Sequence, residues 1–191
     1  MDSTKEDRRV KKTKKQLLLG LTELMQKKKI RDITVRELTD IVDINRGTFY
    51  LHYKDIYDMV DQIEDQLFTE FNSLINKHTP DELKNTPFLL LNDIFTFISN
   101  NADTVIVLTG NNGNITFFNK VKNAVRTHSI NNLTEVYSID KKQIIEYYAS
   151  FQIAACIALV EDWLKKGMKE SPEEMAFLAK KMLRDGINVL K

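Results

Sequence analysis

Residues 33–60 read ITVRELTDIVDINRGTFYLHYKDIYDMV, and this stretch decides how the chain folds. Thr34 is followed three residues later by Glu37, the pattern of a capping box, which predicts the start of a helix. Asn45 can cap a second short helix that ends near Tyr53. Because only a few residues join the two helices, the stretch predicts a helix-turn-helix, whose second helix enters the major groove of DNA.

The side chains of the two helices, expected at 34–42 and 45–53, divide into an apolar set and a polar set. The apolar wedge that fixes the angle between the helices is expected to comprise Val35, Leu38, Ile41, Ile44, Phe49 and Tyr53. The outward face of the second helix then shows Arg46, Thr48, Tyr50 and His52, with Lys54 just beyond. Each of these outward side chains can donate a hydrogen bond to a phosphate or to a base edge.

Gly47 stands in the first turn of the second helix, where a glycine costs about 1 kcal/mol relative to alanine. The N-terminus of a helix presents free amides and a partial positive charge, and both favour an anion. A residue without a side chain at this point lets the backbone approach DNA more closely than any other residue would. The alternative is that Gly47 packs against the preceding helix.

Residues 33–60 resemble the DNA-binding signature of the TetR family of transcriptional regulators, in which a Thr-capped helix, a turn and an (S/N)RGTFY-HF/Y-K recognition helix lead into a long fourth helix. The turn glycine that is usual in the family is Asp43 here, and aspartate tolerates the left-handed conformation better than most residues. Thr39, Ile41 and Val42 replace residues that are small in the family, so we expect somewhat wider helix packing. The resemblance implies that the residues contacting DNA, mostly at phosphates, are Thr34, Arg46, Gly47, Thr48, Tyr50, His52 and Lys54.

Charge is divided unevenly along the 191 residues. Residues 1–54 hold 14 Lys and Arg against 8 Asp and Glu, a net charge of +6, whereas residues 55–191 carry a net charge of −5. A basic head on an acidic body suggests that only the head meets a polyanion, and the alternative is a solubilising tail. The first helix is expected over 13–28, and a basic arm precedes it. This arm either contacts DNA, at phosphates or in the minor groove, or remains solvated. The arm consists of Arg8, Arg9, Lys11, Lys12, Lys14 and Lys15.

The remaining sequence predicts an all-α protein, because no segment alternates with period two for long enough to be a convincing strand. Even TVIVLT, at 104–109, has no partner strand. We expect further helices to begin at caps formed by Asp55, Thr79, Thr86, Asn114 (the helix from Ile115 ending near Thr127), Asp140 (the helix ending at Lys166) and Ser171 (the helix ending near 190). We therefore predict two domains: a helix-turn-helix DNA-binding domain of three helices over 1–54, and a larger helical effector-binding and dimerisation domain over 55–191.

The C-terminal body contains FQIAACIALV (151–160), which is apolar nearly all round. By the family resemblance, this helix and the last one form a four-helix bundle with a second copy across a two-fold axis; the alternative is that they close the monomer core. Aromatic residues predicted to line an effector pocket are Phe95, Phe117, Phe118, Tyr147 and Phe151, although aromatic residues at helical spacing also form ordinary cores. An apolar effector, a protein partner and no effector at all stay open.

Catalytic patterns are absent from the sequence. The three histidines are far apart and show no metal-ligand spacing, and neither HExxH, GxSxG nor GxxxxGK[ST] occurs. The loop GNNGN at 110–114 lacks the Lys-Ser/Thr that would hold phosphates. The single cysteine, Cys156, excludes an internal disulfide and lies in an apolar helix, so we predict an inert thiol. No wholly apolar run reaches the roughly 18 residues of a membrane span, and no signal peptide is recognised.

The sequence thus predicts a cytoplasmic regulator that is not an enzyme and has no metal, cofactor or membrane partner. We expect a repressor that binds a palindromic operator in double-stranded DNA as a homodimer, controlled by an unknown small-molecule or protein effector at its C-terminal domain. The alternative is a TetR-like activator or a protein-interaction module that is controlled by a partner protein.

Overall fold

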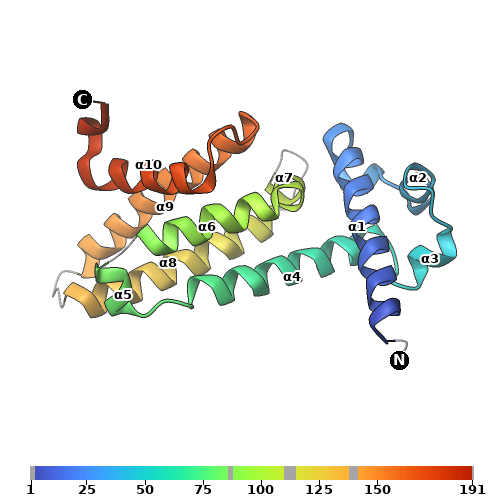
Figure 1. The fold of residues 1–191 in the computed structure, drawn as a ribbon, viewed down its shortest axis with the longest axis horizontal. Helices are drawn as coiled ribbons and strands as arrows, with labels where there is room; N and C mark the ends of the chain where they lie inside the picture. The colour runs from blue at the N-terminus through green and yellow to red at the C-terminus, as the bar shows by residue number, and fades with distance from the viewer. Residues whose placement is uncertain (1–2, 86–87, 110–114, 138–141, 191) are drawn as a thin grey trace. The chain divides into compact units, whose positions relative to one another are not determined.

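The computed structural model describes residues 3–85, 88–109, 115–137 and 142–190, and within these ranges the fold is helical without a strand (Figure 1). The elements are α1 (Ser3–Lys27), a 3₁₀ turn (Ile30–Asp32), α2 (Val35–Ile41), α3 (Arg46–Tyr50), α4 (Ile56–Ile75), α5 (Pro80–Asn85), α6 (Phe88–Asn100), α7 (Ala102–Thr109), α8 (Ile115–Tyr137), α9 (Lys142–Lys165), α10 (Pro172–Asp185) and a second 3₁₀ turn (Gly186–Leu190). The predicted all-α class is confirmed.

Contacts divide the chain into two compact units. The first comprises Met1–Leu67 with Asp103–Phe118, and the second comprises Phe68–Ala102 with Asn119–Lys191. Helices α4 and α8 therefore contribute to both units. The division at residue 54 that the sequence suggests concerns function, and it stays a prediction.

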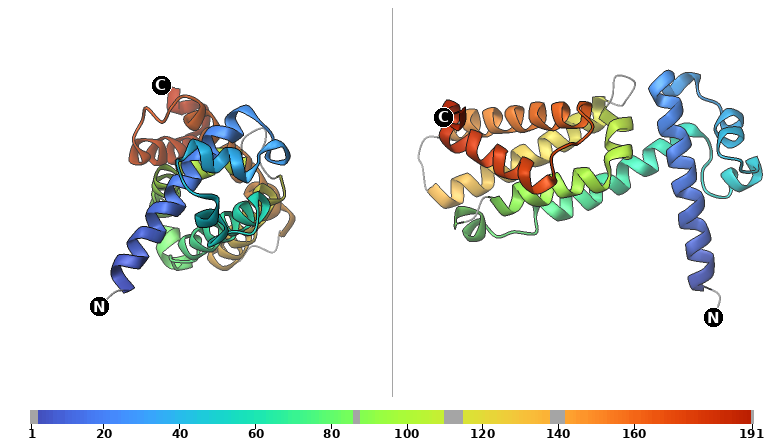
Figure 2. Two further views of the ribbon diagram at one scale, coloured as in Figure 1. Left: turned by 90° about the vertical axis from the view of Figure 1, so that its right-hand side faces the viewer. Right: turned by 45° about the horizontal axis from the view of Figure 1, so that its top comes forward.

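In the first unit, α1 packs against α2 and α2 packs against α3 (Figure 2). The core residues that these helices bury are Leu17, Leu21, Leu24, Met25, Leu38, Phe49 and Tyr53. Gly20 on α1 faces the end of α2: a Cβ atom there would clash with Val42 Cγ1 and lie 3.0 Å from Leu38 Cδ1. The Val42 side chain at the end of α2 therefore packs over Gly20, where α1 has no side chain. Ile41, predicted for the wedge, is instead 43% exposed.

The basic N-terminal residues are helical, which corrects the expectation of an arm before the first helix. Helix α1 begins at Ser3, not at Thr13, and runs unbroken to Lys27. Residues 3–16 contain neither glycine nor proline and are rich in Lys and Arg, which are good helix formers, so the helix continues beyond its first core contact at Leu17. The predicted basic residues are all exposed: Arg8, Arg9, Lys11, Lys12, Lys14 and Lys15.

In the second unit, α10 lies along α6 and also contacts α9 (Figures 1 and 2). The ring centroids of Phe95 and Trp163 are 5.5 Å apart in an edge-on arrangement, and Trp163 Nε1 donates to the carbonyl of Glu170 at 3.0 Å. The predicted Ser171 cap is confirmed, with a complete capping box and proline at the start of α10. Gly167, at φ +79°, makes the turn that lets α10 return.

Several predicted helix limits differ from the structure. Helix α8 continues past Thr127 to Tyr137, α9 ends at Lys165, and α10 ends at Asp185 because Gly186 adopts φ +55°. The stretch TVIVLT lies in α7 and forms no strand. The predicted caps at Thr86, Asn114 and Asp140 and the loop at 110–114 lie outside the described residues.

Candidate nucleic-acid interface

The turn between α2 and α3 is held by local hydrogen bonds. The Thr34 hydroxyl accepts from the Glu37 N–H at 3.2 Å, as the capping box predicts. The Glu37 carboxylate, however, pairs with the Lys28 ammonium, so only half of the predicted box forms. Asp43 adopts φ +51°, the left-handed conformation expected of it, and the Ile44 N–H closes the turn onto the carbonyl of Thr39 at 3.0 Å.

Helix α3 is shorter than the predicted 45–53 but its cap is as expected. The Asn45 side chain accepts from the Gly47 N–H at 2.7 Å. Leu51 donates its N–H to the carbonyl of Gly47 at 3.2 Å, so the helical turn extends to Leu51. Phe49 is fully buried and anchors the inner side of α3, with its ring centroid 5.6 Å from that of Tyr53.

Gly47 is exposed, and its surroundings decide between the two explanations of this glycine. Apart from its chain neighbours and the backbone of its own helix, the only atom of the described residues within 4 Å of a Cβ built on Gly47 is Asn45 Oδ1, at 3.1 Å. No atom of α2 is that close, so the alternative of packing against the preceding helix is wrong. The bare backbone of Gly47 therefore faces outward at the N-terminus of α3, where an approaching duplex meets no side chain at this position.

None of the seven residues predicted to contact DNA is fully buried, but their exposure differs. Those exposed are Thr34, Arg46, Gly47, Tyr50 and Lys54, and those half-buried are Thr48 and His52. Leu51, which the sequence reasoning missed, is 80% exposed. Its position four residues after Gly47 was the available signal, because residues i and i+4 lie on the same face of a helix.

Lys14 ties α1 to the end of the recognition segment. Its Nζ lies 5.5 Å from the centroid of the Tyr53 ring. Burial, and then the charge of Lys14, lower the pKa of His52, so its imidazole is neutral at neutral pH and offers one N–H donor. Burial, and then Asp58, raise the pKa of Tyr53.

The start of α4 fixes the residues that follow α3. Asp55 Oδ1 accepts from the Asp58 N–H at 2.8 Å, the predicted cap, and Asp58 Oδ2 accepts from the Lys54 N–H at 2.7 Å. These two bonds orient the backbone of Lys54 and join the recognition segment firmly to α4.

The five residues predicted for an effector pocket differ in the unit to which they belong and in their exposure. Phe117 and Phe118 belong to the first unit, whereas Phe95, Tyr147 and Phe151 belong to the second. Phe95 is buried against Trp163, and Tyr147 and Phe151 are 67% and 63% exposed.

The second unit instead holds a cavity of about 550 Å³ between the end of α4 and α8. Its polar lining residues are Asn72, Asn76, His78, Lys120, Asn123, Thr127, His128, Asn131 and Asn132. Six of these already have partners. His78 Nε2 lies 2.9 Å from Asp93 Oδ2, Asn132 Nδ2 lies 2.7 Å from His128 Nε2, Asn76 Nδ2 donates to the carbonyl of Asn72 at 2.7 Å, and Lys120 Nζ lies 4.3 Å from the centre of the Phe68 ring. Burial, and then the neighbouring His78, lower the pKa of His128. The sequence alone could not find this site, because its lining comes from two segments far apart in the chain, 68–80 and 120–132, which tertiary packing brings together.

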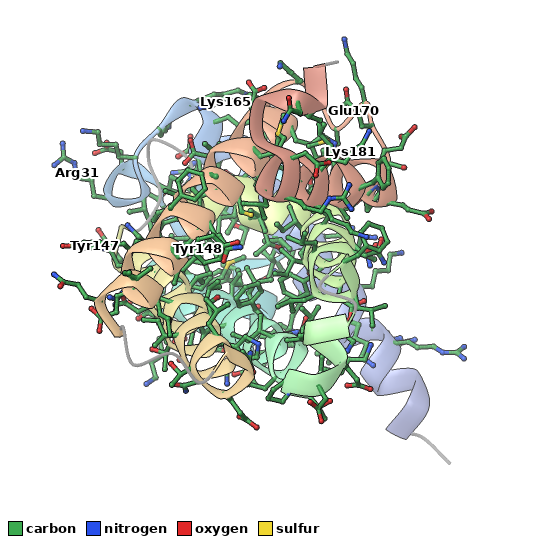
Figure 3. The ribbon with its side chains drawn as sticks, turned by 90° about the vertical axis from the view of Figure 1, so that its left-hand side faces the viewer. Arg31, Tyr147, Tyr148, Lys165, Glu170 and Lys181 are labelled. Carbon is green, nitrogen blue, oxygen red and sulfur yellow. The ribbon has the colours of Figure 1, made fainter. Side chains whose placement is uncertain are left out.

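Helix α9 has one buried face and one exposed apolar face. Its buried residues include Ile145, Ala149, Ile153 and Trp163. The exposed face carries Ile144, Tyr147, Tyr148 and Phe151, followed by Ala154, Ala155 and Ala158, and Figure 3 shows Tyr147 and Tyr148 on the outside of the helix. The segment Gln143–Lys165 is also long and apolar enough to cross a membrane by length and composition, and its most apolar window is only 17% buried.

Groups for metal binding or nucleophilic chemistry are scarce in the described part of the chain. No three His, Cys, Asp or Glu residues there are placed to hold a metal ion. Burial raises the pKa of Cys156 to about 11, so this thiol is protonated and unreactive at neutral pH.

Comparisons with known proteins agree on the type of fold. Residues 85–185, more than half of the chain, match the family described as "Transcriptional regulator C-terminal region". Similar solved structures include a transcriptional regulator of the AcrR family from Aquifex aeolicus VF5 (19% identity, 94% of this chain and 99% of that chain covered, TM-score 0.59). Another is the dihydroxyacetone kinase operon activator DhaS, with 18% identity, 93% of this chain and 97% of that chain covered, and a TM-score of 0.50. A third is FadR from Bacillus subtilis in complex with stearoyl-CoA, with 14% identity, 90% of this chain and 97% of that chain covered, and a TM-score of 0.55. No curated protein matches the sequence.

Proposed function

Because the chain belongs to the TetR family of transcriptional regulators, we propose that it is a repressor that binds a palindromic operator as a homodimer. The observation that carries this proposal is the outward, unobstructed backbone of Gly47 at the N-terminus of α3. Arg46 and Tyr50 are exposed beside it and can donate hydrogen bonds to phosphates. Proteins of this family regulate transcription and are generally not enzymes, and the partner proposed here, DNA, places the protein in the cytoplasm.

The proposed DNA contacts come from three places in the first unit. Arg46, Gly47, Thr48, Tyr50 and His52 belong to α3 and the residues just after it, Thr34 to the N-terminus of α2, and Lys54 to the start of α4. The Gly47 amide is engaged by Asn45, so the gain at Gly47 is close approach of the backbone and not an extra donor. Thr48 and His52, half-buried and neutral, are proposed to set the distance to the backbone phosphates.

Helix α1 is proposed to add contacts to phosphates and none to bases. An α-helix with its side chains is about 10–12 Å wide, whereas the minor groove is about 6 Å wide, so the helical N-terminus cannot enter that groove as an extended arm can. Arg8, Lys12 and Lys15 lie at i, i+4 and i+7 and thus form one stripe along α1. None of the three forms an ion pair with a described residue, which leaves each charge available to a phosphate.

Homodimerisation is proposed through the exposed face of α9 together with α10. The positions 144, 147, 148, 151, 155 and 158 follow the spacing of a single helical stripe, and exposed apolar stripes of this size mark interfaces. The exposed alanines at the C-terminal end allow close approach of a second helix. A second copy is favoured over a bilayer because Glu161, Asp162, Lys165 and Lys166 place exposed charges at the end of the same helix.

Control by an effector is proposed at the polar cavity of the second unit. FadR from Bacillus subtilis was solved with stearoyl-CoA, but the cavity here is lined by five asparagines, two histidines and a lysine. A small hydroxylated or anionic compound suits such a lining better than a long acyl chain does, because each amide can satisfy one polar atom of the ligand. The aromatic residues Tyr147 and Phe151 are correspondingly proposed as dimer contacts.

The experiment is a fluorescence-anisotropy titration of the dimer against duplexes covering the promoter region of its own operon. The proposal expects sequence-selective binding that weakens steeply with salt, because phosphate contacts release counterions. A promoter fusion then separates a repressor from an activator, the role for which DhaS is named. Derepression on deleting the gene supports the proposal, and loss of transcription supports the alternative of an activator.

A further inference from the structure

Leu51 is the most exposed of the large apolar side chains in the described residues, at 80%. Its N–H donates to the carbonyl of Gly47, which places its side chain one helical turn after that glycine and on the same face of α3. The buried Phe49 lies on the opposite side of the helix. Leu51 thus projects from the C-terminal end of the face of α3 that the proposed function brings to DNA.

The neighbours of Leu51 make its apolar character stand out. Arg46, Thr48, Tyr50 and His52 all offer hydrogen-bond donors, and no described acidic side chain bonds to any of them. Phosphate and sugar oxygens accept hydrogen bonds from such donors, whereas a leucine side chain cannot form a hydrogen bond with a phosphate. The major groove offers one apolar group, the C5 methyl of thymine.

We infer that Leu51 reads a thymine in each half-site by packing against its C5 methyl group. This inference rests on the proposed function and adds a base preference to it. Gly47 takes part because a side chain there would hold α3 away from the groove and would lift Leu51 from the base. The contact is apolar, so it contributes to base preference and does not change the number of phosphates neutralised.

The test uses a duplex selected by the wild-type dimer from a random-sequence pool. Each thymine in the selected site is replaced in turn by deoxyuridine, which removes only the methyl group and keeps base pairing. One symmetric pair of replacements is expected to weaken wild-type binding about fourfold per half-site, the worth of one buried methyl group. Leu51→Ala is expected to bind the thymine and deoxyuridine duplexes equally.

Ile41→Ala provides the matched control, since Ile41 is an exposed aliphatic residue of α2 at 43% exposure. This variant is expected to retain the full thymine preference. Because Leu51 is exposed, Leu51→Ala is also expected to melt at the wild-type temperature, so that a loss of preference is not a loss of fold.

Two results would overturn the inference, and only the second would also contradict the proposed DNA binding. If the wild-type protein selects a site but Leu51→Ala keeps the same sensitivity to deoxyuridine, or no thymine is sensitive, Leu51 reads no methyl group and the regulator assignment stands. If no sequence is enriched at all, both the inference and the proposed DNA binding fail.

Discussion

The Asn45 side-chain oxygen accepts the Gly47 N–H at 2.7 Å and lies 3.1 Å from the place that a Cβ on Gly47 would occupy. The cap of α3 and the bare position beside it are thus a single arrangement. A methyl group at residue 47 has to push only against this oxygen, because no other side chain of the described residues lies within 4 Å of it.

We expect Gly47→Ala to separate folding from binding. The alanine gains about 1 kcal/mol of helix propensity, and displacement of the Asn45 cap costs a similar amount, so the free energy of unfolding should change by less than about 1 kcal/mol. Operator affinity should fall at least about tenfold because the backbone is held away from the duplex. Chemical denaturation and anisotropy titration measure the two effects, and unchanged affinity would contradict the close approach at Gly47.

Gly20→Ala should show the opposite pattern. A Cβ at this position clashes with Val42 and crowds Leu38, so overpacking between α1 and α2 should cost about 1–3 kcal/mol of the free energy of unfolding. Binding by the fraction that remains folded should be retained, since Gly20 is buried in the core. Thermal melting checks this prediction, and a melting temperature equal to that of the wild type would show that the two helices separate easily.

The pKa of His52 should respond to Lys14. Burial first, and the Lys14 charge second, hold this pKa below 6.5, so Lys14→Met should raise it without restoring it fully. Because the unfolded chain takes up this proton at a higher pH, the folded state loses stability as the pH falls from about 6.5 through the folded pKa. Lys14→Met should reduce that loss.

NMR titration of the imidazole protons measures this effect, with His128 as the internal control. The pKa of His128 should not move, because burial and the neighbouring His78 lower it and Lys14 does not contribute. An unchanged His52 pKa would mean that the Lys14 ammonium is not held close to it in solution.

The basic stripe of α1 should act on affinity without affecting sequence preference. Replacing Arg8, Lys12 and Lys15 by glutamine should weaken binding to all duplexes by similar factors. The slope of log K against log salt should become shallower by roughly 2 to 3 per subunit, because about 0.9 is lost for each phosphate contact. A triple replacement of Lys165, Lys166 and Lys169 in the second unit is the matched control, and equal slopes in the two variants would argue against α1.

The exposed face of α9 should govern assembly. Tyr147→Glu combined with Phe151→Glu places two charges in the proposed interface and should give monomers by sedimentation velocity, with a helical content that is unchanged because both residues are exposed. Leu89→Glu, on an exposed position of α6, should remain dimeric. A double variant that stays dimeric would place the interface elsewhere.

The sequence predicts well what local hydrogen bonding decides. The caps at Thr34, Asn45, Asp55 and Ser171 all form, and Asp43 adopts its left-handed turn, because each depends on residues within a few positions of it. Local features of this kind are sufficient to predict the helix-turn-helix and the all-α class.

Features that depend on distant residues are not predictable in the same way. The Glu37 carboxylate leaves its cap for Lys28, and the room for Val42 comes from Gly20 on another helix. Which face of α9 is buried depends on contacts with the rest of the unit, so the sequence pattern places Tyr147 and Phe151 in a pocket although both are exposed. The early start of α1 at Ser3 could not be predicted, because the solvated basic segment before Leu17 shows no helical repeat of apolar residues.

The central claim is that α3 enters the major groove twice, once from each subunit. Methylation interference on the selected operator tests it most directly, since methyl groups on guanine N7 block the major groove alone. The account predicts two clusters of interfering positions on one side of the duplex, with centres about one helical turn or a whole multiple of it apart. Interference by minor-groove adenine methylation with none at guanine N7, or a single unpaired cluster, would contradict it.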